Sequence, residues 1–457
     1  MDFSRQSQQA RIDNMQFALE NVKEYGRKIR IRDYMPGQVT YCLGDYPEKV
    51  LTMPTEYDEK LIKSMAERGV ELIQVHEEWN DAMGYHGGDK YHPHDPEGLH
   101  KFVDLCHDNG IKIIPYVSSG YLNPADKYYK PEFSHTDARY DGCFLHYRKG
   151  SADSAAWREF ILPMTLHIMD EYGFDGIYND WGYDGLNTEM QNKIISGEPF
   201  DRHNMPYDPH VEDLLCTIYE EIHKRGGVYK IHDDSTHGIY KEKLYDYLWI
   251  GEGERDAKKQ LLYKDAPLYI VPCPDKAWLP KDNPRFYFAL TIPYVQVPLL
   301  QHGRPVSGMG MVQPHIEYTT LNKLGEPNGD YVRRMKKSEF CRNHPNGPYV
   351  YGRWGLIPDD PNEIEYWSDF LALYKPMVTE GTSVYVDIKK SDIVKSELNE
   401  DTIVTMFINE KTYMVVSNIG DEPVTVELAN EWLNRETGKK EKVITLNGKD
   451  IIFLEKI

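Results

Sequence analysis

The sequence lacks the features that mark several functional classes. No part of its 457 residues approaches the ~18 continuous apolar positions of a membrane helix, so we expect no membrane span. No Gly-x-Gly-x-x-Gly follows the first predicted strand, which disfavours a dinucleotide-binding domain. Basic residues are also scarce, because 53 Lys and Arg stand against 73 Asp and Glu, a net charge of −20. This negative charge disfavours nucleic acid or an anionic membrane as a partner.

Cysteines are few and dispersed, and no Cys-x-x-Cys pair occurs among the six. We interpret Cys106 and Cys216 as reduced core residues, because both fall on the apolar stripes of predicted helices. Residues 1–6 lack the apolar core of a signal peptide. As written, the chain is expected in the cytoplasm, and outside it or in the periplasm if a signal peptide was removed.

One unit recurs between about residue 55 and residue 234: an amphipathic helix, a glycine and a short apolar strand. Leu99, Phe102 and Val103, for example, share a helix face behind a cap at Asp95, and Gly110 ends that helix. Five or more such units in series favour a (β/α)₈ TIM barrel over an open parallel sheet. The predicted strands lie, in chain order, within 28–43 and at 70–75, 111–117, 177–178, 228–231, 244–250, 294–300 and 349–351.

The pattern changes after a predicted helix at 363–374. Short β runs with period-two alternation follow at 402–407, 412–418, 424–428 and 450–454. They predict a small antiparallel β-sandwich that packs on the barrel and has a structural role. The predicted domains are a helical lead-in at 1–27, a catalytic barrel at 28–381 and a C-terminal β-sandwich at 382–457.

Asp180 directly follows the fourth predicted strand and precedes Trp181 and a glycine-rich turn. The carboxyl ends of parallel strands carry the reacting groups of such folds, which favours a catalytic role. The alternative is that Asp180 caps the next helix. Polar residues also follow four other predicted strands: His76-Glu77-Glu78-Trp79, Ser118-Ser119-Gly120-Tyr121, His232-Asp233-Asp234 and Glu252-Gly253-Glu254.

Carboxylates crowded into one pocket repel each other, which raises at least one pKa and places an acid beside a base. Cleavage of a glycosidic bond needs that pair. We prefer Glu252 as the acid. It lies two residues after Ile250, so both side chains are expected to point into the barrel, and it precedes a glycine. An ion pair is the alternative role for Glu252 and Glu254, and Asp233 and Asp234 are the next candidates. The predicted sugar contacts are Glu77, Trp79, Trp181, His232, Asp233, Glu254 and Arg304.

His92-Pro93-His94 has the His-x-His spacing of some metal-dependent hydrolases. That motif belongs at the end of a first barrel strand, whereas this one precedes a capped helix. We therefore expect no metal and no other cofactor.

From Val75 to Asp180 the sequence resembles the retaining α-glycosidase clan that contains the α-galactosidases. The matching motifs are Val75-His76-Glu77-Glu78-Trp79, Gly88-Asp89, Asp95-Pro96-Glu97-Gly98-Leu99, Gly110-Ile111-Lys112 and Tyr178-Asn179-Asp180. The resemblance implies that Asp180 is the nucleophile. The chain departs from the family at His76 and Glu77, where two Asp are usual, and at Asn179, where a Trp is usual. It also lacks the Arg-x-x-x-Asp that supplies the family's acid.

These observations predict a glycoside hydrolase that cleaves an α-linked sugar, of the α-galactoside or α-glucoside type, with retention of configuration. Asp180 is the predicted nucleophile and Glu252 the predicted acid/base. One alternative is a non-catalytic carbohydrate-binding barrel, since a decayed site would lack the family acid. Another is a metal-dependent hydrolase that uses His76, Glu77, His232 and Asp233. The sequence leaves the sugar, the linkage and the oligomeric state open.

Overall fold

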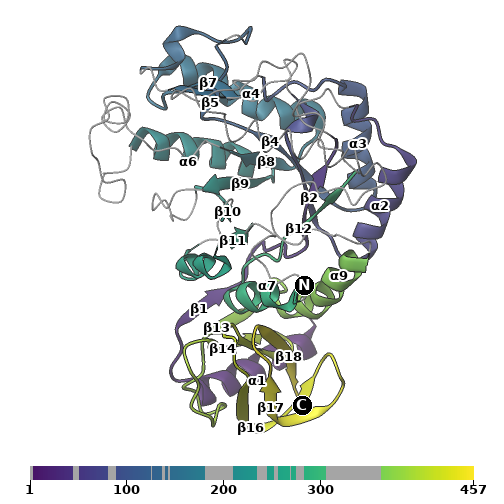
Figure 1. The fold of residues 1–457 in the computed structure, drawn as a ribbon, viewed down its shortest axis with the longest axis vertical. Coiled ribbons are helices and arrows are strands. Elements are labelled where there is room, and N and C mark those ends of the chain that lie inside the picture. Colours follow the sequence, from purple (N-terminus) through teal and green to yellow (C-terminus); the bar gives the residue numbers. More distant parts are fainter. Residues whose placement is uncertain are drawn as a thin grey trace, which may run out of the picture.

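The computed structural model describes most of the chain. The described residues are 4–44, 51–80, 89–124, 126–135, 139–142, 145–180, 209–233, 244–251, 256–267, 269–273, 283–304 and 362–457. Within them, no helix is both long enough and apolar enough to span a membrane. Figure 1 shows the parallel strands and their helices at the top and the C-terminal sheet below them.

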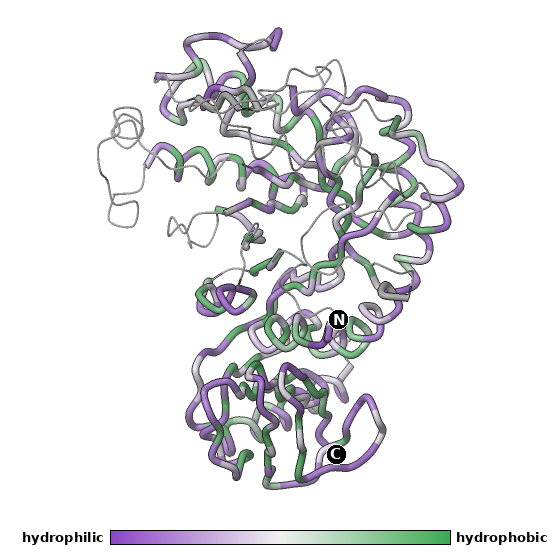
Figure 2. The backbone as a smooth tube through the Cα atoms, viewed as in Figure 1, coloured by the Kyte–Doolittle hydropathy of each residue, from purple (hydrophilic) through white to green (hydrophobic). Residues whose placement is uncertain are grey.

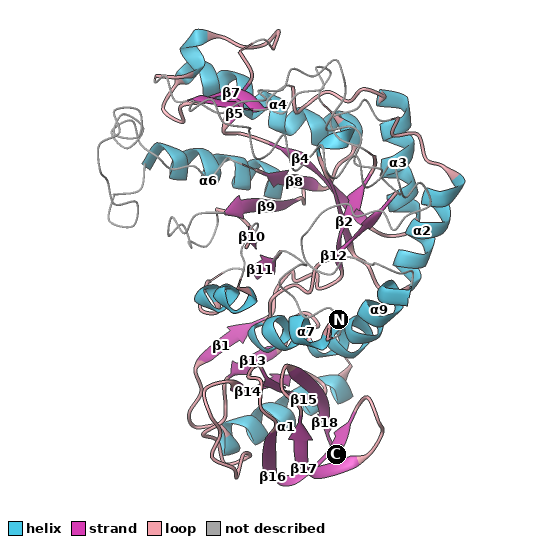
Figure 3. Cartoon of the chain, in the orientation of Figure 1, coloured by secondary structure: helices cyan, strands magenta, loops and turns pink. Residues whose placement is uncertain are grey.

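Eight parallel strands form the central sheet (Figure 3). In chain order they are β2 Gln38–Cys42, β3 Leu72–Val75, β4 Lys112–Val117, β8 Gly176–Asn179, β9 Val228–Asp233, β10 Tyr247–Ile250, β11 Tyr269–Pro272 and β12 Leu300–Gly303. Neighbours in the sheet follow the order β11-β10-β9-β8-β4-β3-β2-β12, so the last strand pairs with the first. This strand order, in which β12 lies beside β2, confirms the predicted (β/α)₈ barrel.

Helices α2 Glu56–Glu67, α3 Pro96–Asp108, α4 Ala155–Tyr172 and α6 Pro209–Lys224 surround the strands. The sequence determines their ends. Asp95 caps α3 by accepting from the Gly98 amide, with Pro96 at the first position, and Thr55 forms a capping box with Asp58 at the start of α2. Gly173 ends α4 at φ 76°, a left-handed conformation that glycine adopts without strain.

The seventh and eighth strands differ from the prediction. Of the predicted strand at 294–300, only Leu300 belongs to a strand, β12. Tyr294 ends the 3₁₀ turn η6 Ile292–Tyr294, Val295 has φ 58°, and Pro298 has no amide hydrogen to pair. The seventh strand is β11, which the sequence pattern did not predict. The predicted strand at 349–351 lies outside the described residues, and β12 occupies the place beside β2.

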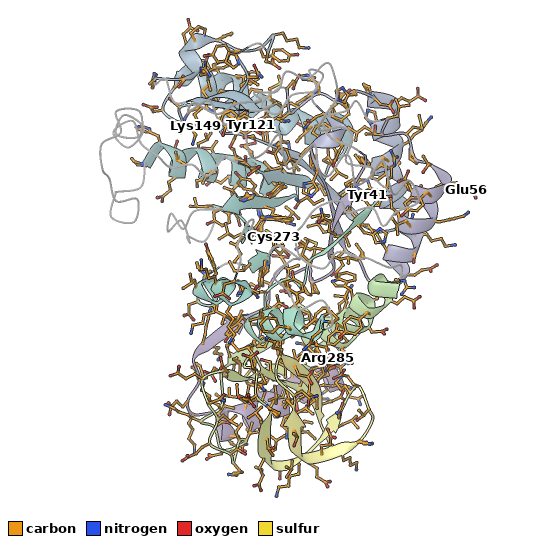
Figure 4. All side chains as sticks on the ribbon, in the orientation of Figure 1. Tyr41, Glu56, Tyr121, Lys149, Cys273 and Arg285 are labelled. Carbon is orange, nitrogen blue, oxygen red and sulfur yellow. The ribbon has the colours of Figure 1, made fainter. Side chains whose placement is uncertain are left out.

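A small antiparallel sheet follows the third barrel strand. It consists of β5 Tyr121–Leu122, β6 Arg139–Gly142 and β7 Leu145–Lys149, in the order β5-β7-β6. Tyr121 and Lys149, labelled in Figure 4, are register partners in it. The sequence analysis did not predict this inserted sheet, which lies between β4 and α4.

A seven-stranded antiparallel sheet forms the C-terminal domain. It contains β13 Ser383–Val386, β14 Thr402–Ile408, β15 Thr412–Asn418, β16 Val424–Asn434, β17 Lys440–Leu446 and β18 Asp450–Lys456, and also β1 Arg27–Arg30. Helix α1 Arg5–Asn21 joins its core through Ala18. The N-terminal segment therefore packs with the last domain, although 28 was the predicted start of the barrel. The domain limits themselves remain predictions.

Helices α7 Arg285–Thr291 and α9 Asn362–Tyr374 lie between the barrel and this sheet. Figure 2 shows α7 as largely apolar, and its residues from Phe286 to Thr291 are all buried. Phe370 stacks on Phe288 at 4.2 Å between ring centroids and meets Phe453 of β18 at 5.7 Å. Arg285, labelled in Figure 4, forms ion pairs with Glu436 and Asp450. One face of the C-terminal sheet thus shares the apolar core of the barrel, whereas a separate apolar core lies between the sheet and α1.

Cysteine placement partly follows the prediction. Cys106 is fully buried on α3, and Cys216 is only partly buried on α6. Both are free thiols, as are Cys42 and Cys273.

Candidate active site

Asp180 lies at the carboxyl end of β8, the fourth barrel strand. Its backbone amide donates to the carbonyl oxygen of Val117 across 2.9 Å, which extends the pairing of β8 with β4. Its side chain is 13% exposed, so the carboxylate is largely buried but can be reached. The strand ends therefore present this acid where the sequence predicted it.

Tyrosines hold one oxygen of the Asp180 carboxylate. The Tyr116 hydroxyl donates to Oδ2 across 2.7 Å, and it lies 3.0 Å from the hydroxyl of Tyr121. Since the single Tyr116 proton goes to Asp180, Tyr121 is the donor in the second contact. Each hydrogen bond polarises the next, so the bond from Tyr121 to Tyr116 strengthens the bond from Tyr116 to Oδ2 of Asp180.

His232 lies beside the other oxygen. Its Nδ1 lies 3.3 Å from Oδ1 of Asp180 and 2.6 Å from the Tyr178 hydroxyl. A carboxylate oxygen attracts Nδ1 only when that nitrogen carries a proton. The pair is therefore favourable with His232 as the Nδ1–H tautomer or as the imidazolium. Tyr178 comes from the same strand as Asp180, two residues earlier and on the same face.

Outward-facing residues fix the ends of these strands. Asn179 donates to the Ser119 and Tyr229 hydroxyl oxygens, each across 2.7 Å, and accepts from the Ser119 amide across 2.9 Å. Trp157 of α4 donates its indole N–H to the Ser119 carbonyl oxygen across 3.1 Å. Asn179 thus links the ends of two strands through three hydrogen bonds.

Solved enzyme structures match this chain over nearly its whole length. A maltogenic α-amylase from Thermotoga neapolitana is 13% identical at a TM-score of 0.52, covering 93% of this chain and 99% of its own. Trehalose-6-phosphate hydrolase from Bacillus licheniformis is 13% identical at 0.54, covering 93% and 100%. Trehalulose synthase from Pseudomonas mesoacidophila is 11% identical at 0.56, covering 93% and 99%. The chain has the fold of these three enzymes. No family model and no curated protein sequence matches it.

Two predicted sugar contacts have other roles in this barrel. Trp79 is completely buried, donates its indole N–H to the Tyr116 carbonyl oxygen across 3.1 Å and packs on Phe174. It has no free face on which a sugar could stack. Arg304 forms an ion pair with Asp58 of α2 at 2.8 Å and donates to the carbonyl oxygens of Leu43, Leu51 and Met53. These contacts use its donors without a substrate.

Other predicted residues are described only in part or not at all. Trp181, Glu252 and Glu254 lie outside the described residues, and for Glu77 and Asp233 the structure describes the backbone alone. Glu77 begins the 3₁₀ turn η1 Glu77–Trp79, and Asp233 is the last residue of β9.

The parity argument for Glu252 is wrong. Trp249 is the register partner of His232, and its ring lies 5.4 Å from that of Tyr178, so Trp249 faces inward. Ile250 therefore faces the helices. Gly251 then adopts φ 89°, which ends the strand and its alternation. Alternation along β10 thus gives no direction for the side chain of Glu252, which remains a candidate by its position alone.

The metal-dependent alternative rests on residues that are only partly described. Among the described side chains, no three His, Cys, Asp or Glu residues are placed to hold a metal ion. Two of the four residues that this alternative needs, Glu77 and Asp233, have undescribed side chains.

Sequence reasoning missed Tyr116 and Tyr178. The available signal was their alternation with Ser118 and Asp180, which places each tyrosine on the inward face of its strand.

Proposed function

We propose that this protein is a retaining α-glycosidase that acts on an α-linked glucoside, with Asp180 as the nucleophile. The observation that carries the proposal is the bound Asp180 carboxylate at the carboxyl end of the fourth barrel strand. The structural neighbours, an α-amylase, a trehalose-6-phosphate hydrolase and a trehalulose synthase, support an α-glucoside over an α-galactoside.

The two oxygens of Asp180 have different parts in the proposed reaction. Oδ2 accepts the 2.7 Å hydrogen bond from Tyr116, and Oδ1 lies 3.3 Å from His232 Nδ1. We assign the attack to Oδ1, because the short bond holds Oδ2 toward β4. Its electron pair forms an ester bond to the anomeric carbon while the glycosidic bond breaks. The leaving oxygen takes a proton from the acid. The resulting carboxylate then removes a proton from water, which attacks the same carbon and releases Asp180.

Glu252 is our proposed acid/base, because it follows the sixth strand at the same end of the barrel as Asp180. Glu254, Asp233 and Asp234 are the other candidates. Glu77, Trp181, His232, Asp233 and Glu254 remain proposed sugar contacts. Trp79 and Arg304 are not proposed again, because their bonds within the protein account for them.

Covalent trapping tests this proposal most directly. Aryl α-glucosides, α-galactosides and β-glucosides are assayed first, and the enzyme is then treated with a 5-fluoro α-glucosyl fluoride. We expect hydrolysis of the α-glucoside and one added sugar on Asp180, located by peptide mass spectrometry. Asp180→Asn should fold normally, lose turnover by several orders of magnitude and take no label.

Asp170→Asn is the matched control, since Asp170 on α4 forms only a surface ion pair with Arg225. It should retain turnover and label. Binding of oligosaccharides without hydrolysis would indicate a carbohydrate-binding barrel. Activity that depends on a metal found by elemental analysis would indicate a metal-dependent hydrolase. A label on another residue would exclude Asp180 as the nucleophile.

A further inference from the structure

Lys230 lies inside the barrel, directly below the Asp180–His232 pair. It precedes His232 by two residues on β9 and shares its inward-facing side, which places the two Cα atoms roughly 6–7 Å apart. Its register partner on β8 is Tyr178, whose hydroxyl lies 2.6 Å from His232 Nδ1. The amine therefore belongs to the layer that supports the proposed nucleophile.

The Lys230 amine is completely buried and has no hydrogen-bond partner among the described residues. Its Nζ lies 5.6 Å from the centroid of the Trp249 ring, a weak cation–π contact. Other inward positions are also polar, since Thr40 and Gln74 are register partners with unpaired side-chain atoms. A buried lysine without an acidic partner is costly, so its presence in the barrel interior calls for a role beyond packing.

The titratable and aromatic groups at neighbouring inward positions come from several strands. Tyr178 belongs to β8, Asp180 directly follows it, and His232 follows Lys230 on β9. Trp249 belongs to β10, where Tyr247 is the register partner of Lys230. Cys273 follows β11 and raises the pKa of Lys230 slightly, and His76 follows β3 with its ring 6.2 Å from Trp249. Asp180 is the one carboxylate in this set.

We propose that Lys230 is a positioning residue whose ammonium keeps the Asp180 carboxylate ionised and His232 uncharged at acidic pH. This inference rests on the proposed function of Asp180. A positive charge in the layer below favours an anion and disfavours a second cation, and the low dielectric of the barrel interior strengthens both effects. Asp180 and His232 share one contact, so they titrate as a coupled pair.

The sign of the effect follows from where the amine itself titrates. Burial lowers the pKa of the Lys230 amine to about 7. Lys230 is therefore charged below pH 7, the range in which carboxylates and imidazoles titrate. Removing that charge raises the pKa of both Asp180 and His232, and the acid limb of kcat/KM moves to higher pH.

The test compares wild type, Lys230→Met and Lys230→Arg with an aryl α-glucoside between pH 3 and 9. We expect Lys230→Met to raise the acid limb by about one pH unit, and Lys230→Arg, which keeps the charge, to leave the limb in place. Lys101→Met is the matched control, because Lys101 carries the same charge on the outer face of α3 and pairs only with Glu97. Lys230→Gln is the second uncharged variant if the methionine variant does not fold.

Two readouts do not depend on turnover. The first is the midpoint of the His232 titration from ¹⁵N-histidine NMR, assigned with His232→Gln, which should rise in Lys230→Met. The second is thermal stability against pH. Unfolded Lys230 binds a proton up to about pH 10.4, whereas the folded amine releases it near pH 7. As the pH rises from 7 to about 10.4, the Tm of wild type should therefore increase relative to that of Lys230→Met.

These readouts separate failure of the inference from failure of the proposed function. A shifted His232 titration without α-glucosidase activity in wild type would preserve the role of Lys230 and overturn the proposed reaction. Active enzyme with unchanged acid limb and unchanged His232 titration in both uncharged variants would overturn the inference. An equal limb shift in Lys101→Met would also overturn it, because the effect would then follow net charge.

Discussion

Tyr116 and Asp180 form a hydrogen bond of 2.7 Å between two neighbouring barrel strands. The bond spans the end of the β4–β8 pairing, where Tyr116 and Tyr178 are register partners. It fixes the carboxylate through a side chain that is itself buried and bonded to Tyr121. A nucleophile held in this way loses little freedom when it attacks.

Tyr116→Phe tests this bond. A hydrogen bond to a charged group is worth about 1.5–3 kcal/mol, so we expect kcat/KM to fall by roughly 10- to 100-fold. KM should change less than kcat, because the substrate pocket keeps its shape. Tyr121→Phe removes only the second bond in the chain and should cost less than Tyr116→Phe. Equal losses in the two variants, measured by steady-state kinetics, would contradict the larger role assigned to the bond from Tyr116.

The sequence predicted the scaffold better than the site. Helix caps such as Asp95 and strand ends such as Asp180 depend on local chemistry, so their positions could be read directly. Trp79 and Arg304 were misjudged, because residue type alone does not distinguish a buried indole or a paired guanidinium from a substrate contact. The parity assigned to Glu252 was wrong because Trp249, and not Ile250, faces inward, and the left-handed Gly251 then ends the alternation.

Asp58→Asn is expected to destabilise the fold in a pH-dependent manner. Burial alone would raise the pKa of Asp58, but bonds from Arg304, Tyr41 and Thr55 hold it below its usual value. The ionised Asp58 carboxylate therefore contributes its full stability above the unfolded pKa of about 3.9. This stability is lost as the pH falls through the lower pKa of Asp58 in the folded state. We expect a loss of about 3–5 kcal/mol at pH 7, the typical result of breaking a buried ion pair.

Urea unfolding at pH 7, 5, 4 and 3 measures this difference. The difference in the free energy of unfolding between wild type and Asp58→Asn should become smaller below pH 4. Asp170→Asn removes an exposed ion pair with Arg225 and should change stability by less than about 1 kcal/mol. A gap that widens on acidification would mean that the pKa of Asp58 is raised in the folded state.

Deleting residues 382–457 is expected to give insoluble protein. The deletion removes the strands that pair with β1 and exposes Phe370 and the apolar face of α7. Phe453→Ala is the milder variant, with an expected loss of about 3–5 kcal/mol and an unchanged ratio of kcat/KM between two substrates. A soluble truncated protein with altered substrate preference would instead assign a binding role to the C-terminal domain.

Retention of configuration is the sharpest expectation for the chemistry. If Asp180 attacks and Glu252 protonates, their carboxyl groups lie about 5–5.5 Å apart, without room for a water between them and the sugar. NMR of the first product should then show the anomer of the substrate. Glu252→Ala should hydrolyse activated aryl glycosides far better than natural ones, because a good leaving group needs no proton. Added azide should rescue it by replacing water in the second step, where no base is then needed. Parallel Glu254→Ala, Asp233→Ala and Asp234→Ala variants identify the acid, because only the variant that lacks it shows both effects. An inverted product would mean that water attacks with Asp180 as its base.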